Sequence, residues 1–202
     1  MAEAERDVID LLIDAREDTA IDRIRRQRPT ARENAQKSFE ALFAPGSPSG
    51  VTVKERYAIA TFVASLHRDD GIAAFYRDGL AALDMENNVA EAIESEANSG
   101  AAAGPYGRYP KGPLSIEDGT GPVHQVSAAN RRILGARLSA ALEHAHLLVF
   151  RPREASPAAL QALAAAGWST TEIVTLSQLV AFLCFQIRAI VGLKALANAT
   201  IA

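Results

Sequence analysis

Apolar residues recur along most of the chain at the three- and four-residue spacing of an amphipathic α-helix. After Thr52, for example, Ile59, Phe62, Val63 and Leu66 fall on one helical face. No segment shows the sustained alternation of apolar and polar residues that indicates a half-buried strand. We therefore predict an all-α fold.

Helix starts are marked by capping boxes, in which a Ser or Thr side chain accepts from a backbone amide while a Glu three residues later reaches back. Such boxes are predicted at Thr30–Glu33, Thr52–Glu55 and Ser169–Glu172. Ser127 and Ser156 are further N-cap candidates, and Gly167 suits a left-handed helix end. The predicted helices begin near residues 30, 52, 71, 88, 127, 156 and 169, the last running nearly to the C-terminus.

The helix predicted after Ser127 carries apolar residues at helical spacing. We expect Ile133, Leu134, Leu138 and Val149 to face the core.

Residues 99–125 lack this periodicity and hold six of the 13 glycines and four of the nine prolines. They separate an N-terminal helical lobe, residues 1–98, from a C-terminal helical lobe, residues 126–202. So long a non-periodic segment is typical of an ordered arm, a lid over a site, or a linker. All three remain open at this point.

The two lobes share a weak sequence echo. Thr52–His67 aligns without a gap on Ser169–Cys184, matching both capping boxes and a Val-Ala-x-Leu string. The match favours two pseudo-repeated helical lobes.

Composition narrows the class of protein. The net charge of −3 gives no reason to expect nucleic-acid binding. An arginine cluster, residues 23–32, follows several aspartates, so we interpret it as an ion-paired face. The longest uninterrupted apolar run, Leu179–Phe185, has seven residues, whereas a membrane span needs about 20. We expect a soluble cytoplasmic protein that needs no membrane and no cofactor.

Three stretches in order resemble the AhpD-like alkylhydroperoxidase and carboxymuconolactone decarboxylase superfamily, in particular its two-lobed, peroxidase-related branch. They are Val51–His67, Ala162–Ile173 and Leu179–Leu193, the last containing Phe185-Gln-Ile-Arg188. The resemblance implies an all-helical fold and homo-oligomers. It also implies a Cys-x-x-Cys pair at a helix N-terminus, with a Glu and a His relaying protons.

This chain has one cysteine, Cys184, and therefore lacks that pair. Aligned on the Val-Ala-Ser-Leu string, Asp69 and Ile72 occupy the cysteine positions, Tyr57 replaces the Glu and Tyr76 the His. Aligned on Glu55 instead, His67 and Asp70 occupy the cysteine positions and Ala74 replaces the His. We favour the first register because it preserves the apolar face. Neither restores a thiol, so disulfide-type peroxidase chemistry is not expected.

The polar residues at this position suggest acid–base chemistry. His67, Asp69 and Asp70 could move a proton on a small organic substrate, and Tyr57 and Tyr76 could donate to a developing oxyanion. The structural alternative is that Asp69 or Asp70 is the N-cap of the next helix and His67 ends the preceding one.

Other candidates carry weaker signals. Arg188 could bind a substrate carboxylate, with Glu55 as a second substrate-binding residue, or form a buried ion pair with Glu143 or Asp69. His144 and His146 are two residues apart on a predicted helix and do not share a face, so we predict no metal site. Cys184 is expected to be an inert core residue.

Two functions follow. The first is a non-thiol acid–base enzyme with a small-molecule ligand. The alternative is a non-catalytic, homo-oligomeric scaffold or binding partner. In that case we expect the arm around Tyr106–Tyr109 to lie across a neighbouring subunit. Residual thiol peroxidase activity is the least favoured reading.

Overall fold

The computed structural model describes residues 7–46, 50–83 and 88–201, and all regular secondary structure in these ranges is helical. Extended backbone pairs there only at one isolated bridge, Gly107–Gly119. The all-α prediction is confirmed. The elements are α1 (Val8–Leu12), α2 (Ala20–Arg26), α3 (Pro29–Phe43), α4 (Val53–Leu66), α5 (Asp70–Ala81), α6 (Asn88–Ser99), η1 (Pro113–Glu117), α7 (Ala128–Phe150), η2 (Pro152–Glu154), α8 (Pro157–Ala165) and α9 (Thr170–Ile201).

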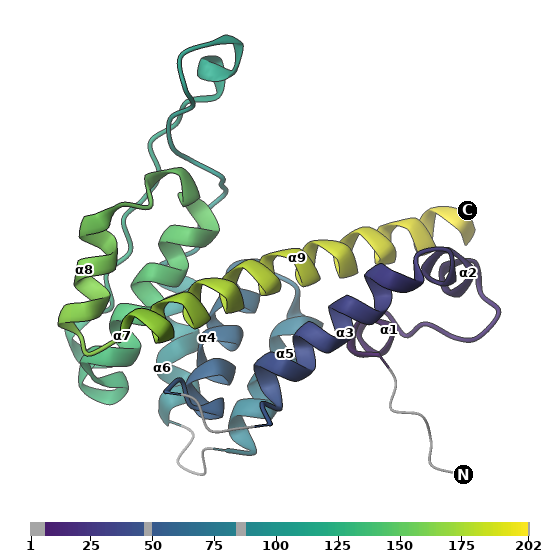
Figure 1. Ribbon diagram of the computed structural model, residues 1–202, viewed down its shortest axis with the longest axis horizontal. Helices are drawn as coiled ribbons and strands as arrows, with labels where there is room; N and C mark the ends of the chain where they lie inside the picture. The colour runs from purple at the N-terminus through teal and green to yellow at the C-terminus, as the bar shows by residue number, and fades with distance from the viewer. Residues whose placement is uncertain (1–6, 47–49, 84–87, 202) are drawn as a thin grey trace.

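Helix α4 lies at the centre of the fold and packs against α3, α5, α6, α7 and α9 (Figure 1). Its residues Ile59, Phe62 and Val63 are fully buried. Burial of such side chains contributes about 1.5–3 kcal/mol each, so α4 supplies a large share of the hydrophobic core. Helix α9 crosses the molecule from α7 and α8 to α1 and α2 (Figure 1). A single core cluster contains residues from both predicted lobes.

Two of the three predicted capping boxes form. Thr52 and Glu55 bond reciprocally at the start of α4. Ser169 and Glu172 do so before α9. The box predicted at Thr30 is wrong: α3 starts at Pro29, with no side-chain cap. Proline is favoured at the first helical position because its fixed φ suits the helix and its missing amide is not needed there. Thr30 therefore lies inside the helix.

The other predicted helix caps are also present. Ser127 accepts from the amide of Asn130, and Ser156 from that of Ala159. Gly167 has φ +93°, the left-handed conformation that glycine adopts without strain.

Helix α7 is interrupted at Gly135, where φ is +74° and ψ is +167°. The break rotates the first turns out of register with the rest of the helix. Leu134 is buried, but Ile133 is 44% exposed, so the prediction that Ile133 faces the core is wrong. A face drawn by continuous helical spacing cannot anticipate this break.

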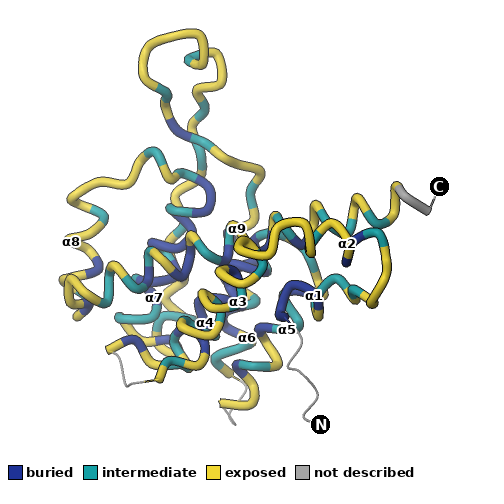
Figure 2. Tube along the Cα trace, turned by 45° about the vertical axis from the view of Figure 1, so that its right-hand side comes forward, coloured by how far each residue is buried: buried dark blue, intermediate teal, exposed yellow. Residues whose placement is uncertain are grey.

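Residues 101–125 project from the body as an extended loop that returns close to its start (Figures 1 and 2). Gly107 and Gly119 exchange backbone hydrogen bonds of 2.8 and 3.2 Å across the loop. At its base Tyr106 donates its amide to Phe150 O, and Arg153 lies 3.5 Å from the centroid of the Tyr109 ring. We call this segment the arm.

Arg137 of α7 joins the two capping boxes. Its Nε lies 2.7 Å from Glu55 Oε1, and its Nη2 lies 2.8 Å from Glu172 Oε1. The same guanidinium donates to the carbonyl oxygens of Gly50 and Gly167. These acceptors are matching positions of the sequence echo, so one side chain contacts both segments in the same way. The duplication itself stays a prediction.

Among the described residues, α7 and α9 are each long and apolar enough to cross a membrane. Core helices pass the same test, and 56% of the apolar window of α7 is buried in the protein, against 33% for α9. The seven-residue apolar run Leu179–Phe185, taken alone, therefore underestimates the hydropathy of α9 as a whole.

Candidate functional site

The turn between α4 and α5 carries the polar residues that the sequence singles out. His67 is the C-cap of α4, Arg68 follows with φ +59°, and Asp69 is the N-cap of α5. The Asp69 side chain accepts from the amide of Ile72 at 3.0 Å. The structural alternative for Asp69, an N-cap, is therefore what the fold shows.

Asp69 also forms an ion pair with Lys194 of α9, whose Nζ lies 3.0 Å from Asp69 Oδ2. Burial acts to raise the pKa of Asp69, but the bonds from Ile72 and Lys194 outweigh it and leave the pKa lowered. A carboxylate held in this way is ionised at neutral pH and makes a poor proton donor.

His67 faces a different acceptor. Its Nδ1 lies 2.8 Å from Val63 O, one turn back in α4. Burial lowers the pKa of His67, although the contact with Val63 opposes this. The described contacts therefore do not join His67 and Asp69 into an acid–base pair. Asp70, the first residue of α5, is exposed.

Tyr57 and Tyr76 lie together, with ring centroids 6.4 Å apart, inside an aromatic cluster. Phe43 contacts both rings, at 4.9 Å from Tyr57 and 5.3 Å from Tyr76, and Phe75 packs edge-on against Tyr76. The Tyr76 hydroxyl donates to Gln186 Oε1 on α9, and both residues are fully buried. Burial raises the pKa of each tyrosine. Neither hydroxyl is therefore available as an anion near neutral pH.

The two predicted substrate-binding residues lie apart from one another. Glu55 is engaged by its capping box and by Arg137. Arg188 is exposed and donates to Cys184 O at 3.2 Å. The predicted buried ion pair of Arg188 is wrong, because Asp69 pairs with Lys194 and Glu143 pairs with Arg131. Arg188 lies on the outward side of α9, where water solvates its charge.

A polar groove of about 440 Å³ opens beside the turn, lined by Asp69, Asp70, Arg68, Arg77 and neighbouring residues. His67, Tyr57, Tyr76 and Arg188 do not line it. The structure thus brings Asp69 and Asp70 to one opening, buries Tyr76 in the core and leaves Tyr57 half-buried against it.

Cys184 lines a different, largely apolar groove of about 440 Å³ together with Arg188 and Leu148. Burial raises the pKa of its thiol. A raised pKa leaves less thiolate at neutral pH, so the thiol is a weak nucleophile. This agrees with the prediction of an unreactive residue, although Cys184 is half-buried at the edge of the core.

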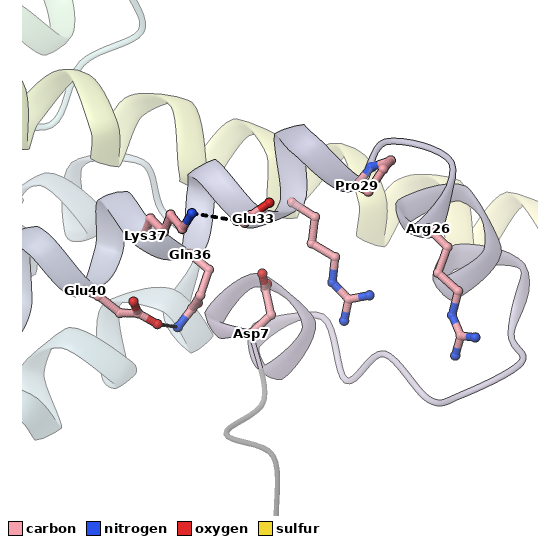
Figure 3. A pocket seen from close by; sticks show the side chains of 8 residues that line it. Asp7, Arg26, Pro29, Glu33, Gln36, Lys37 and Glu40 are labelled. Carbon is pink, nitrogen blue, oxygen red and sulfur yellow. Dashed lines mark hydrogen bonds and ion pairs between the residues drawn. The ribbon is translucent and has the colours of Figure 1, made fainter.

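An open cleft of about 550 Å³ between α1, α2 and α3 is strongly charged (Figure 3). Its charges are engaged by protein partners: Lys37 with Glu33, Arg26 with Asp22, and Arg32 with Asp10. Asp7 and Asp10 also bind Arg25. The prediction that the arginine cluster is ion-paired is confirmed for Arg25, Arg26 and Arg32, and the cleft offers little unsatisfied charge to a ligand.

Sequence reasoning missed a buried cluster where the arm rejoins α7. Nε2 of His124 lies 3.3 Å from Oε2 of Glu96, and the His124 ring stacks on His146 with centroids 5.0 Å apart. Glu96 lies in α6 and His124 near the end of the arm, 28 positions later, so helical spacing gives no sign of their contact. His144 and His146 are both buried in α7, and the described residues contain no group of three or more side chains arranged to bind a metal ion.

The chain matches no protein-family model, and no curated protein matches it significantly.

Proposed function

We propose that this chain is a non-catalytic, self-associating helical scaffold, built on an AhpD-like framework whose thiol site has been replaced. The observation that carries the proposal is the Tyr76–Gln186 contact in packed core. In the favoured register, Tyr76 stands where the resemblance places a proton-relaying His. Asp69 and Ile72, at the cysteine positions, serve as an N-cap and a fully buried core residue.

The outer face of α9 supports self-association. Exposed residues follow one another at steps of three or four, which places them along one stripe of the helix. This α9 stripe comprises Val174, Gln178, Ala181, Phe185, Arg188 and Gly192. Phe185 is 54% exposed and Val174 is 51% exposed. The small residues Ala181 and Gly192 allow a second helix to approach closely.

The arm supplies a second apolar surface. In η1, Leu114 is 53% exposed and Ile116 is 91% exposed. The outer part of the arm is largely exposed (Figure 2). A projecting segment with its own backbone hydrogen bonds resembles an interaction arm more than a linker. Because the resemblance implies homo-oligomers, we assign both surfaces to contacts with further copies of this chain. In a closed symmetric assembly, every copy buries the same surfaces against its neighbours.

The test is the mass of the protein in solution, measured by light scattering behind a sizing column. The wild type is expected at a multiple of 21.5 kDa. Phe185→Glu should weaken association at least tenfold, because a desolvated carboxylate opposes the contact. Leu160→Glu is the matched control, since Leu160 is 44% exposed on α8, away from both surfaces. Equal masses for the two variants would contradict the assignment.

Acid–base catalysis at the α4–α5 turn is a second candidate, supported by the groove that Asp69 and Asp70 line. Asp69→Ser keeps an N-cap and removes the carboxylate. If a screen of small lactones and esters found a substrate, turnover should fall at least a hundredfold in Asp69→Ser. Unchanged turnover would exclude Asp69 from the chemistry.

A further inference from the structure

A cleft of about 180 Å³ lies between α7, α8 and the end of the arm. It shares no lining residue with the groove beside the α4–α5 turn. Leu147, Leu163 and Ala159 form much of its wall. His124, His144 and Arg151 also line it. We call it the α7–α8 cleft. Its volume corresponds to roughly six water molecules.

Two residues that line the cleft each have a buried side-chain nitrogen without a hydrogen-bond partner. They are Nδ1 of His144 and Nε of Arg151, which are two of the six such side-chain atoms among the described residues. His144 is 5% exposed, and the side chain of Arg151 is 11% exposed. Buried polar groups are normally hydrogen-bonded, so these two nitrogens are hydrogen-bonding groups that the fold leaves unused beside the cleft.

The imidazole of His124 is fixed by contacts with Glu96 and His146. Glu96 Oε1 accepts from the Ser127 amide at 3.1 Å and from Asn130 Nδ2 at 2.7 Å, which leaves Oε2 beside the imidazole. On the other side, the ring stacks on His146, whose Nε2 lies 2.9 Å from Gly100 O. The cleft therefore presents a fixed imidazole rather than a mobile surface side chain.

The charge in the cleft is well defined. Burial lowers the pKa of His124, although Glu96 and Glu143 oppose this, and burial also lowers the pKa of His144. Both rings are therefore neutral near pH 7, each with one N–H and one lone pair. The Nη1 of Arg151 pairs with Glu154, and its Nε has no hydrogen-bond partner. Glu143, also in the lining, is engaged by Arg131 and by the amide of Val126.

We propose that the α7–α8 cleft binds a short-chain carboxylate, with the carboxylate on Arg151 and the imidazole of His144 and the hydrocarbon part against Leu147 and Leu163. A guanidinium and neutral N–H donors match carboxylate oxygens, and the apolar wall favours a chain of a few carbons. The cleft is lined by residues of α7, α8 and the arm, so the proposal is independent of self-association through α9.

The test titrates butyrate into the full-length protein and follows the ring protons of the four histidines by NMR. The His144 and His124 signals should shift in a saturable way, with a Kd on the order of 1 mM for so small a ligand. The His67 signal should not shift, because His67 lies outside the cleft. Butyramide, which has the same shape without the charge, should bind at least tenfold more weakly.

Two variants separate the cleft from general effects. Arg151→Gln should weaken butyrate binding at least tenfold, whereas Arg132→Gln removes an exposed charge from α7, the helix that Arg151 follows, and should leave binding unchanged. Ala159→Leu fills the cleft without removing a hydrogen-bonding group and should abolish binding, while Ala158→Leu on the exposed side of α8 should not. The proposal is overturned if no saturable shift appears below 50 mM (about fifty times the expected Kd), or if Ala159→Leu binds as well as the wild type.

Discussion

The hydroxyl of Tyr76 on α5 donates to Oε1 of Gln186 on α9, and the two side chains are buried at a sequence separation of 110 residues. Gln186 lies in one of the stretches that carry the family resemblance, and the favoured register places Tyr76 at the position of the expected relay His. The contact uses a polar side chain at the expected relay position to hold two helices together. It thereby favours a structural role over a catalytic one.

Tyr76→Phe should destabilise the protein by about 1–3 kcal/mol in urea unfolding, because it leaves Gln186 buried with no partner for either amide atom. Adding Gln186→Leu should recover part of the loss, since both polar groups are then gone. Tyr109→Phe, in the arm, is the control and should be neutral. A Tyr76→Phe variant as stable as the wild type would show that the contact does not hold the fold.

Arg137→Ala should lower stability by about 2 kcal/mol near pH 6, because Arg137 donates to two carboxylates and two carbonyl oxygens. The hydrogen bond from Arg137 is the main cause that lowers the pKa of Glu172 from 4.5 to about 2.

This pKa fixes the sign of the pH dependence. A carboxylate with a lowered folded pKa stabilises the fold above its unfolded pKa, and the contribution is lost as the pH falls from about 4.5 towards about 2. The difference in Tm between wild type and Arg137→Ala should therefore shrink between pH 6 and pH 2.5. A constant difference would mean that Glu172 is not the group through which Arg137 acts.

Gly79→Ala tests the packing around Tyr57. A Cβ at residue 79 would lie 2.2 Å from Tyr57 Cε1, whereas one at Gly71 in the same helix would come no closer than 3.4 Å to Asp69 Oδ1. The first substitution should destabilise the fold by about 1–3 kcal/mol through overpacking. Gly71→Ala should be neutral or stabilising by up to about 1 kcal/mol, the helix propensity of alanine. Equal thermal stabilities would contradict the close Tyr57 contact.

Cys184 should react slowly with a thiol reagent at pH 8 in the native protein and rapidly after unfolding, because burial raises its pKa. Cys184→Ser should leave the fold intact. Rapid native-state labelling would revive the reading of a reactive thiol.

Local sequence signals located most of the helices, since capping boxes and helical spacing depend on residues a few positions apart. The box at Thr30 failed because Pro29 was a stronger start signal, and the face through Ile133 failed because Gly135 breaks the helix. The contacts of Lys194 with Asp69 and of Glu96 with His124 could not be predicted, because each depends on how distant segments pack. The polar turn at His67–Asp70 was located correctly in the sequence, but its hydrogen-bond partners come from the fold.

Sedimentation equilibrium of the untagged wild-type chain in detergent-free buffer tests the scaffold proposal most directly. Burying the α9 stripe and the arm tip of each copy predicts a defined multiple of 21.5 kDa at micromolar concentration. A mass of 21.5 kDa at every concentration up to about 100 μM would contradict self-association and with it the proposed function. Any remaining association would then be weaker than that of a specific interface of standard size.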